Sequence, residues 1–181
     1  DVSLTVRPEH VAIANAPEMS RVETVNERTR VRFARTQPLP TYLVAFAVGP
    51  FDVVEAEIPP NDVRSRPVPF RGVTVQGRGA GVSYALEQTP VLLAALEEYF
   101  GNGYPYAKLD VLAVPDFGAG AMANAGAITF RDSLLLFDEA SMTGAHKMRF
   151  AGTMAHELAH QWFGNLVTLA WWNDVWLNEG F

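Results

Sequence analysis

Short runs of alternating hydrophobic and polar positions fill the first 75 residues of the chain. Val2, Leu4 and Val6 interleave with polar residues, and the same pattern recurs around Val31. A period of two is typical of strands with one buried face, and the Pro and Gly clusters between the runs indicate turns. We therefore predict an all-β unit of antiparallel strands over residues 1–76.

A helical period follows a Gly-rich joint at residues 77–81. After this joint, four apolar residues are spaced three and four apart like one face of a helix: Leu92, Leu96, Tyr99 and Phe100. We expect Thr89-Pro90 to cap or kink this helix. The later patterns predict strands over residues 109–113 and 127–130, a long helix over residues 145–166 and another helix after Trp171. Helices and strands are thus mixed beyond residue 77, and the predicted fold class is α+β.

Composition and charge narrow the function classes. With 49% hydrophobic residues over 181 positions, the chain can bury a sizeable core. Its 14 Lys and Arg compare with 20 Asp and Glu, for a net charge of -6, and no dense basic stretch could follow a phosphate backbone. Nucleic-acid binding is therefore disfavoured. The absence of cysteine excludes disulfides, iron–sulfur clusters and thiolate metal sites, so any metal must be held by nitrogen and oxygen.

No transmembrane helix is predicted, because the most apolar stretch, residues 39–51, is interrupted by Pro and Gly and is too short to cross a bilayer. The chain begins at Asp1 without a Met or a leader and stops within a predicted helix, which indicates a piece of a longer protein. Without a leader, a membrane segment or disulfides, we expect a cytoplasmic location. The sequence indicates no oligomeric state.

The strongest chemical signal is the run His156-Glu157-Leu158-Ala159-His160. On a helix, a spacing of four residues places both imidazoles on one face, about 40° apart around the axis, where one metal ion reaches both. Glu157 would lie beside that ion, where it can take a proton from a water molecule. We therefore predict a zinc site with His156 and His160 as ligands and Glu157 as general base.

A catalytic zinc ion normally has three protein ligands and one open position. Glu179 is the best candidate for the third ligand, because it lies 19 residues after His160, far enough for the helix to end and the chain to return. From the residues alone, a Glu at a helix start is also typical of a solvated charge. Asp174 or Asn178 could support the ligands from a second layer, although Asp174 could equally cap a helix.

Several short phrases occur in a characteristic order and spacing: Pro115-Asp116-Phe117, Gly120-Ala121-Met122-Ala123-Asn124, the two-histidine run and Trp176-Leu177-Asn178-Glu179-Gly180-Phe181. This series resembles the aminopeptidase N family of zinc aminopeptidases, and residues 38–49 are similar to the end of that family's N-terminal β-domain. The resemblance implies the end of a saddle-like β-domain over residues 1–76, then the first portion of a thermolysin-like catalytic domain over residues 77–181. It also implies Glu179 as the third ligand of one zinc ion, and a peptide substrate.

The Gly-Ala-Met-Glu-Asn segment of that family is an edge strand that binds the peptide through main-chain hydrogen bonds. The resemblance therefore implies substrate contacts from the matching residues 120–124. Gly120 and Ala121 match the positions that contact the peptide with their backbone, and Met122 would help to form the pocket for the first side chain. Ala123 and Asn124 complete the predicted set. From composition alone, a packed core Met is an equally good interpretation of Met122.

Ala123 departs from the family motif, in which a Glu pairs with the free α-amine of the substrate. A cation left unpaired in a partly desolvated pocket costs about 2 to 5 kcal/mol, so peptide turnover would fall by roughly 30-fold to several thousand-fold. Four nearby acids could substitute for that Glu, although each is more simply a loop or surface charge: Asp116, Asp132, Asp138 and Glu139.

A second departure is that the family tyrosine that stabilises the tetrahedral intermediate would lie beyond residue 181. The function predicted for the parent protein is hydrolysis of the N-terminal peptide bond of peptides. We expect Ala123 and truncation to impair this activity in the present chain. Two alternatives stay open. One is a zinc endopeptidase, which needs no free amine, and the other is a catalytically silent peptide-binding module with a structural metal.

Overall fold

The computed structural model describes residues 1–180, apart from the side chain of Glu139; Phe181, the last residue of the predicted motif at the end of the chain, lies outside the described residues. The strands are β1 (Ser3–Val6), β2 (Val11–Ala14), β3 (Glu18–Thr24), β4 (Arg28–Phe33), β5 (Phe46–Gly49), β6 (Phe51–Ile58), β7 (Val68–Val75), β8 (Leu109–Val114), β9 (Ala121–Met122) and β10 (Ala127–Arg131). The α-helices are α1 (Ser83–Phe100), α2 (Asp132–Leu135), α3 (Gly144–Ala159) and α4 (Trp176–Glu179). Short 3-10 helices are η1 (Thr41–Leu43), η2 (Gly79–Val82), η3 (Glu139–Ser141) and η4 (Trp172–Asp174). The predicted α+β class is confirmed.

The first strands are antiparallel, as the alternating pattern predicts. β4 lies between β1 and β3 in a three-stranded sheet, and β2 pairs with β5 in a separate two-stranded ribbon. Along β4, Thr29, Val31 and Phe33 are buried, while the arginines that alternate with them are exposed. The buried face packs on a small core with Val6 and Ala12, so one side of this sheet is apolar and the other is polar.

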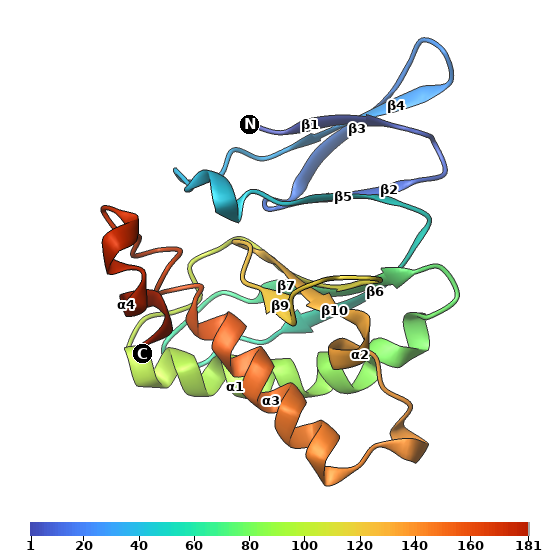
Figure 1. Cartoon of the computed structure of the whole chain (residues 1–181). Helices are drawn as coiled ribbons and strands as arrows, with labels where there is room; N and C mark the ends of the chain where they lie inside the picture. Colours follow the sequence, from blue (N-terminus) through green and yellow to red (C-terminus); the bar gives the residue numbers. More distant parts are fainter. Residues whose placement is uncertain (181) are drawn as a thin grey trace.

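A five-stranded sheet in the order β6-β7-β8-β10-β9 forms the middle layer of the molecule (Figure 1). β8 is parallel to both of its neighbours, whereas β6 and β9 are antiparallel edge strands. The hydrogen bonding of this sheet crosses the domain boundary predicted at residue 76, because β6 and β7 join the same sheet as β8. The division into residues 1–76 and 77–181 stays a prediction, and two strands from the first part are hydrogen-bonded to the second.

The five-stranded sheet is covered on both faces (Figure 1). Helices α1 and α3 pack on one face, where Leu109 and Val111 of β8 join the main core. The β2–β5 ribbon covers the other face, where Leu112 of β8 packs against Ile13 of β2. Because β8 is buried on both faces, it is a nearly continuous apolar run. The helix that contains His156 is thus packed on the main core of the molecule.

Two helix predictions need correction. α1 begins at Ser83 and continues through Pro90, and its fully buried line consists of Ala85, Thr89, Leu93 and Glu97. Tyr99, predicted on the buried face, is 80% exposed. The hydropathy pattern misplaces this face because two members of the buried line are polar. The helix predicted over residues 145–166 ends at Ala159, just before His160.

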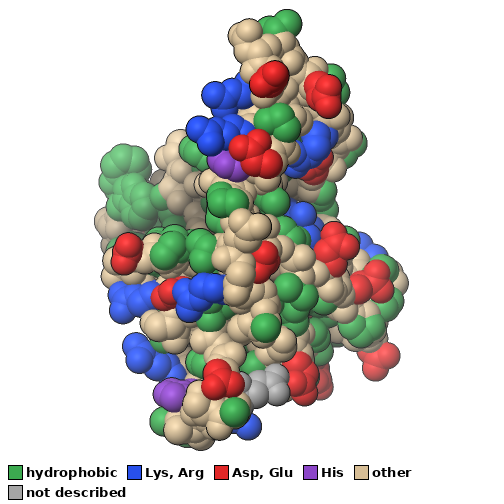
Figure 2. All heavy atoms as spheres, turned by 90° about the vertical axis from the view of Figure 1, so that its right-hand side faces the viewer, with side chains coloured by type: hydrophobic (Ala, Val, Ile, Leu, Met, Phe, Trp, Pro, Cys, Tyr) green, Lys and Arg blue, Asp and Glu red, His purple; other side chains and the backbone are tan. Residues whose placement is uncertain are grey.

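Acidic and basic side chains are interspersed on the face of the molecule turned to the viewer in Figure 2. Opposite charges are joined at the surface in pairs such as Arg21–Glu18 and Arg78–Asp132.

Among residues 1–180, no helix has both the length and the apolar character needed to cross a bilayer.

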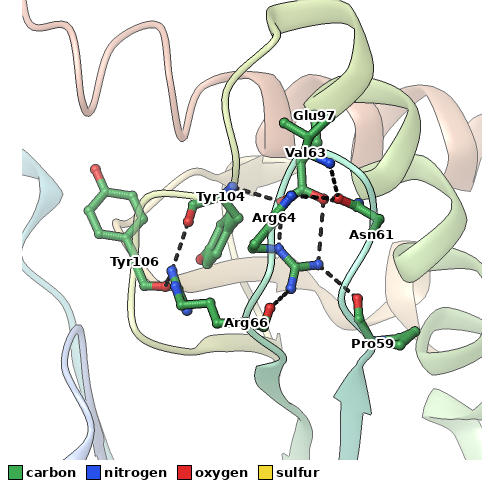
Figure 3. A network of polar contacts seen from close by, with 8 residues as sticks. All are labelled: Pro59, Asn61, Val63, Arg64, Arg66, Glu97, Tyr104 and Tyr106. Atoms are coloured by element: carbon green, nitrogen blue, oxygen red, sulfur yellow. Dashed lines mark hydrogen bonds and ion pairs between the residues drawn. The ribbon is translucent and has the colours of Figure 1, made fainter.

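A buried ion pair joins the loop between β6 and β7 to the last turn of α1 (Figure 3). Arg64 Nε donates to Glu97 Oε1 at 2.6 Å, and the two side chains are 3% and 0% exposed. Glu97 also accepts hydrogen bonds from the Asn61 side chain and from the backbone N–H of Tyr104. A buried carboxylate is tolerated only when its oxygens are paired in this way. The pair therefore fixes the end of α1 against the loop between β6 and β7.

We expect the substitution Glu97→Gln to lower the free energy of unfolding by about 3 to 5 kcal/mol, because it leaves the Arg64 charge buried without a counter-ion. The measurement is urea unfolding followed by circular dichroism. Glu18→Gln is the matched control, since it breaks a pair with Arg21 at 3.0 Å near the surface. The control should cost less than about 1 kcal/mol. Equal losses in the two variants would contradict the importance given to burial.

Candidate metal centre

The two histidines of the motif lie on the face of α3 that is turned away from the core. Phe150, Met154 and Leu158 are buried against the sheet and α1, and their spacing of four residues defines the apolar face of the helix. His156 and His160 share the opposite side, where both line a pocket. The packing of one helix face thus aims both imidazoles at the same space.

Three side chains converge in this pocket with a geometry that fits a metal ion. His156 Nε2 and His160 Nε2 are 3.0 Å apart, and Glu179 oxygens lie 3.5 Å and 3.6 Å from these two nitrogens. Four ligands arranged tetrahedrally at the usual zinc distances of about 2.0–2.1 Å are about 3.4 Å from one another. Two imidazole nitrogens that face each other this closely also need a shared cation or proton between them. The donor set therefore suits a zinc ion.

His160 is the residue at which α3 stops. Its Nδ1 lies 3.0 Å from the Phe163 carbonyl oxygen, and because a carbonyl only accepts, Nδ1 must carry the proton in this hydrogen bond. Nε2 is then left free for a metal. Gly164, which follows Phe163, has a φ of +109°, a conformation that residues with a side chain rarely adopt. A Cβ at this position would lie 3.5 Å from His160 Nδ1. The helix predicted to continue to residue 166 ends at Ala159 because the chain then changes to tighter turns, with Gln161 N–H bonded to the Leu158 carbonyl, and reaches a positive φ at Gly164.

Glu179 approaches from a separate segment. It lies in the four-residue helix α4, which follows η4, and its side chain is 60% exposed. Asn178 lines the pocket beside it, whereas Asp174, the other residue predicted to support the ligands, lies in η4 and does not line the pocket. The chain does reverse between α3 and α4, as the 19-residue spacing predicts.

Glu157 is buried, with 6% of its surface exposed, and it lines the same pocket. Burial raises the pKa of its carboxyl group to about 7, and the negative charge of Glu179 adds to this rise. Burial, followed by the nearby His160, lowers the pKa of His156. Near neutral pH, His156 is therefore in the unprotonated form that binds metals, while Glu157 can both take and give a proton.

The pocket has a volume of about 310 Å³, and the edge strand β9 forms one of its walls. Of the five predicted substrate-binding residues, Ala121, Met122 and Ala123 line it. Gly120 and Asn124 do not. The Gly120 carbonyl accepts from the backbone N–H of Arg131 at 2.8 Å, and the buried Asn124 side chain bonds to the backbone oxygen of Leu43 and to the Thr129 hydroxyl. These two residues hold the strand in place rather than form the pocket surface.

The acids that could replace the family Glu lie outside this pocket. Asp132 pairs with Arg78 at 2.6 Å, and Asp138 accepts from the backbone N–H of Ala140. Asp116 follows β8 in a turn with a positive φ. None of these three lines the pocket, and the side chain of Glu139 is outside the described part of the chain. Among the described residues, the pocket acids are Glu157 and Glu179.

Sequence reasoning missed the buried amides that hold the segment after β9. Asn165 Nδ2 donates to the Ala123 carbonyl at 2.8 Å, Gln161 Oε1 accepts from Gly126 N–H at 3.1 Å, and Asn15 Nδ2 donates to the Ala125 carbonyl at 2.9 Å. The only signal in the sequence is that Gln161 and Asn165 follow closely on His160. An amide side chain gives no indication of its partner, so their role required the structure.

A tyrosine from the N-terminal part of the chain also lines the pocket. Tyr42 in η1 donates its hydroxyl to the Gly164 carbonyl at 3.1 Å, across 122 residues of sequence. In the sequence, residues 38–49 indicate only a family resemblance. The proximity of Tyr42 to the histidines was not predicted.

Comparison with known proteins gives consistent matches. Residues 84–181 match the model of the peptidase family M1 domain. Over 181 residues, the chain is 46% identical to aminopeptidase M1-A of Oryza sativa subsp. japonica, covering 99% of the chain and 20% of that protein. Over 180 residues, it is 41% identical to aminopeptidase A of Gloydius brevicauda and to endoplasmic reticulum aminopeptidase 1 of Homo sapiens, covering 99% of the chain and 18% of each. The chain thus spans about a fifth of the length of these curated relatives.

The raised pKa of Glu157 gives a prediction for the metal-free chain. Because the folded-state pKa of about 7 exceeds the ordinary 4.5, protonated Glu157 contributes stability that is complete below about pH 4.5 and is lost as the pH rises through about 7. Glu157→Gln removes this loss. Relative to the unchanged chain, the variant should gain up to about 3 kcal/mol between pH 4.5 and pH 8.5.

Urea unfolding in the presence of a chelator at the two pH values measures this gain. Glu98→Gln is the control, because it removes the same charge from an exposed position near the end of α1. The control should respond equally at both pH values. A Glu157→Gln variant whose stability relative to the unchanged chain does not depend on pH would contradict the prediction.

Proposed function

Because the chain belongs to peptidase family M1, as its motifs predict, we propose that the protein is a zinc-dependent aminopeptidase that hydrolyses the N-terminal peptide bond of peptides. One observation carries the proposal: His156, His160 and Glu179 present ligand atoms within 4.8 Å of one another in the pocket that Glu157 also lines. The relatives named above are aminopeptidases. In line with the resemblance, we assign the first strands to the end of a saddle-like β-domain and the helical part to a thermolysin-like domain.

In the proposed reaction, Nε2 of His156, Nε2 of His160 and the Glu179 carboxylate hold one zinc ion. Zinc bound there supplies a Lewis acid for the scissile carbonyl and lowers the pKa of a water molecule. Glu157 takes the proton from the attacking water and later gives it to the leaving amine. A carboxyl whose pKa is near neutral suits both transfers.

The edge strand β9 supplies the surface on which we propose that the peptide lies. Ala121 and Met122 pair with β10 on one side only, so the other side of β9 is available for strand addition. A peptide added there would run beside the two histidines. Met122 would contact the first side chain of the substrate.

Ala123 favours a second candidate, a zinc endopeptidase. Ala123 lines a pocket in which, among the described residues, Glu157 and Glu179 are the acids. Both already have roles in the proposed chemistry, so a substrate α-amine gains no dedicated anionic partner. An endopeptidase does not need one. A silent binding module is less favoured, because a structural metal site has no use for a buried carboxylate such as Glu157 beside it.

The first test replaces the proposed base. In the full-length protein, Glu157→Gln should keep zinc bound and lower turnover of a free-amine peptide by at least about 10²-fold, because the amide cannot accept the proton. Zinc content by atomic emission and peptide hydrolysis by chromatography are measured on the same samples. Retained turnover with a full complement of zinc would remove Glu157 from the role of base.

The second test restores the missing carboxylate. Ala123→Glu in the full-length protein should raise turnover of free-amine peptides by roughly 30-fold to several thousand-fold, because it pairs the α-amine, and should leave N-acetylated peptides unchanged. Ala123→Gln is the matched control, with a side chain of the same size and no charge. If the unchanged protein cleaves acetylated and free peptides equally and Ala123→Glu brings no gain, the endopeptidase is the better assignment.

A further inference from the structure

Tyr42 contacts both of the segments that present metal ligands, although it lies far from them in the sequence. Its hydroxyl donates to the Gly164 carbonyl at 3.1 Å. Its ring packs on Trp172, with the ring centroids 5.1 Å apart and the planes inclined by 55°. Gly164 belongs to the turn after His160, and Trp172 begins η4, which leads into α4 and Glu179.

The turn at Gly164 controls the orientation of His160. His160 is the C-cap of α3: its N–H still donates to the His156 carbonyl, whereas its own carbonyl accepts from the Asn165 N–H at 3.1 Å, within the turn. Its imidazole is held by the Phe163 carbonyl, and Phe163 precedes Gly164 in the same turn. A hydrogen bond from Tyr42 to the Gly164 carbonyl therefore restrains the peptide unit next to the acceptor of the His160 proton.

The segment with Glu179 needs support from outside itself. α4 has four residues, none of them buried, and the side chain of Glu179 is 60% exposed. A helix this short has little stability of its own. Trp172, at the start of the preceding η4, packs on Tyr42 and lines the same pocket as the ligands. The contact between the Tyr42 and Trp172 rings thus fixes the position of η4, from which the chain continues into α4.

We propose that Tyr42 is a positioning residue for the metal centre. Its hydroxyl fixes the turn that orients His160, and its ring fixes the segment that presents Glu179. The inference rests on the zinc site of the proposed function and adds a requirement to it. The affinity of the site for zinc depends on a side chain from the N-terminal β-part, which supplies no ligand.

The experiment compares two tyrosines that make the same bond. The Tyr42 hydroxyl donates to a backbone oxygen at 3.1 Å, and so does the Tyr104 hydroxyl, whose acceptor is Lys108. Tyr42→Phe and Tyr104→Phe each delete one such hydrogen bond and keep the ring. Zinc affinity of the full chain is measured by competition with a chromogenic chelator. We expect Tyr42→Phe to weaken zinc binding by about 3- to 10-fold and Tyr104→Phe to change it less than about twofold.

Two further measurements separate positioning from general stability. Tyr42→Ala, which also removes the ring, should weaken zinc binding more than Tyr42→Phe. Nitrogen-15 NMR of the imidazoles reports the proton on His160 Nδ1, and its exchange with solvent should be faster in Tyr42→Phe than in the unchanged chain or in Tyr104→Phe. A merely structural tyrosine would not change the exchange of this one proton selectively.

Equal zinc affinities for Tyr42→Phe and the unchanged chain would overturn the proposal, as would an equal loss in Tyr104→Phe. An unchanged chain that binds no zinc would overturn both this inference and the proposed function. If zinc binding responds to Tyr42 as expected but the full-length protein hydrolyses no peptide, the proposed function fails and the positioning role of Tyr42 stands.

Discussion

The pocket depends on one constraint: residues 123–126, between β9 and β10, are buried but belong to no regular element. Buried backbone groups must find hydrogen-bond partners. In this segment some of them bond to other backbone groups, as Asn124 N–H does to the Met122 carbonyl, and others have side-chain partners. Asn15, Gln161 and Asn165 supply them from the β2–β5 ribbon and from the turn after α3. The wall of the pocket and the end of α3 are therefore joined directly by hydrogen bonds.

The convergence of the two histidines could be predicted from the sequence because their relation is local. A spacing of four residues on a helix fixes the relation of His156 to His160 whatever surrounds them. Glu179 needed the family resemblance, since its approach depends on a 19-residue connection with irregular turns. Tyr42 and Asn15 were beyond reach, because a contact across more than 100 residues leaves no periodicity in the sequence.

The fold shows a similar division. Alternating runs predicted the first strands, since one face of each meets water. α1 was harder to place because Glu97 lies in its buried line, where a carboxylate is acceptable only through the distant Arg64. In β8, Asp110 is fully buried between Arg71 and Lys108, and Lys108 also donates to the Gly126 carbonyl. Such internal charges contradict the hydropathy pattern wherever a partner from another element compensates them.

The shortness of β9 limits how the protein could read a peptide. The strand has two residues, and strands advance by about 3.3 Å per residue, so an added chain could form regular main-chain bonds over roughly 7 Å. A peptide bound in this way would form main-chain hydrogen bonds with the sheet over about two of its residues, and its other residues would make no such bonds with β9. Recognition through β9 would therefore be almost independent of peptide length, and any preference for longer chains must come from another surface.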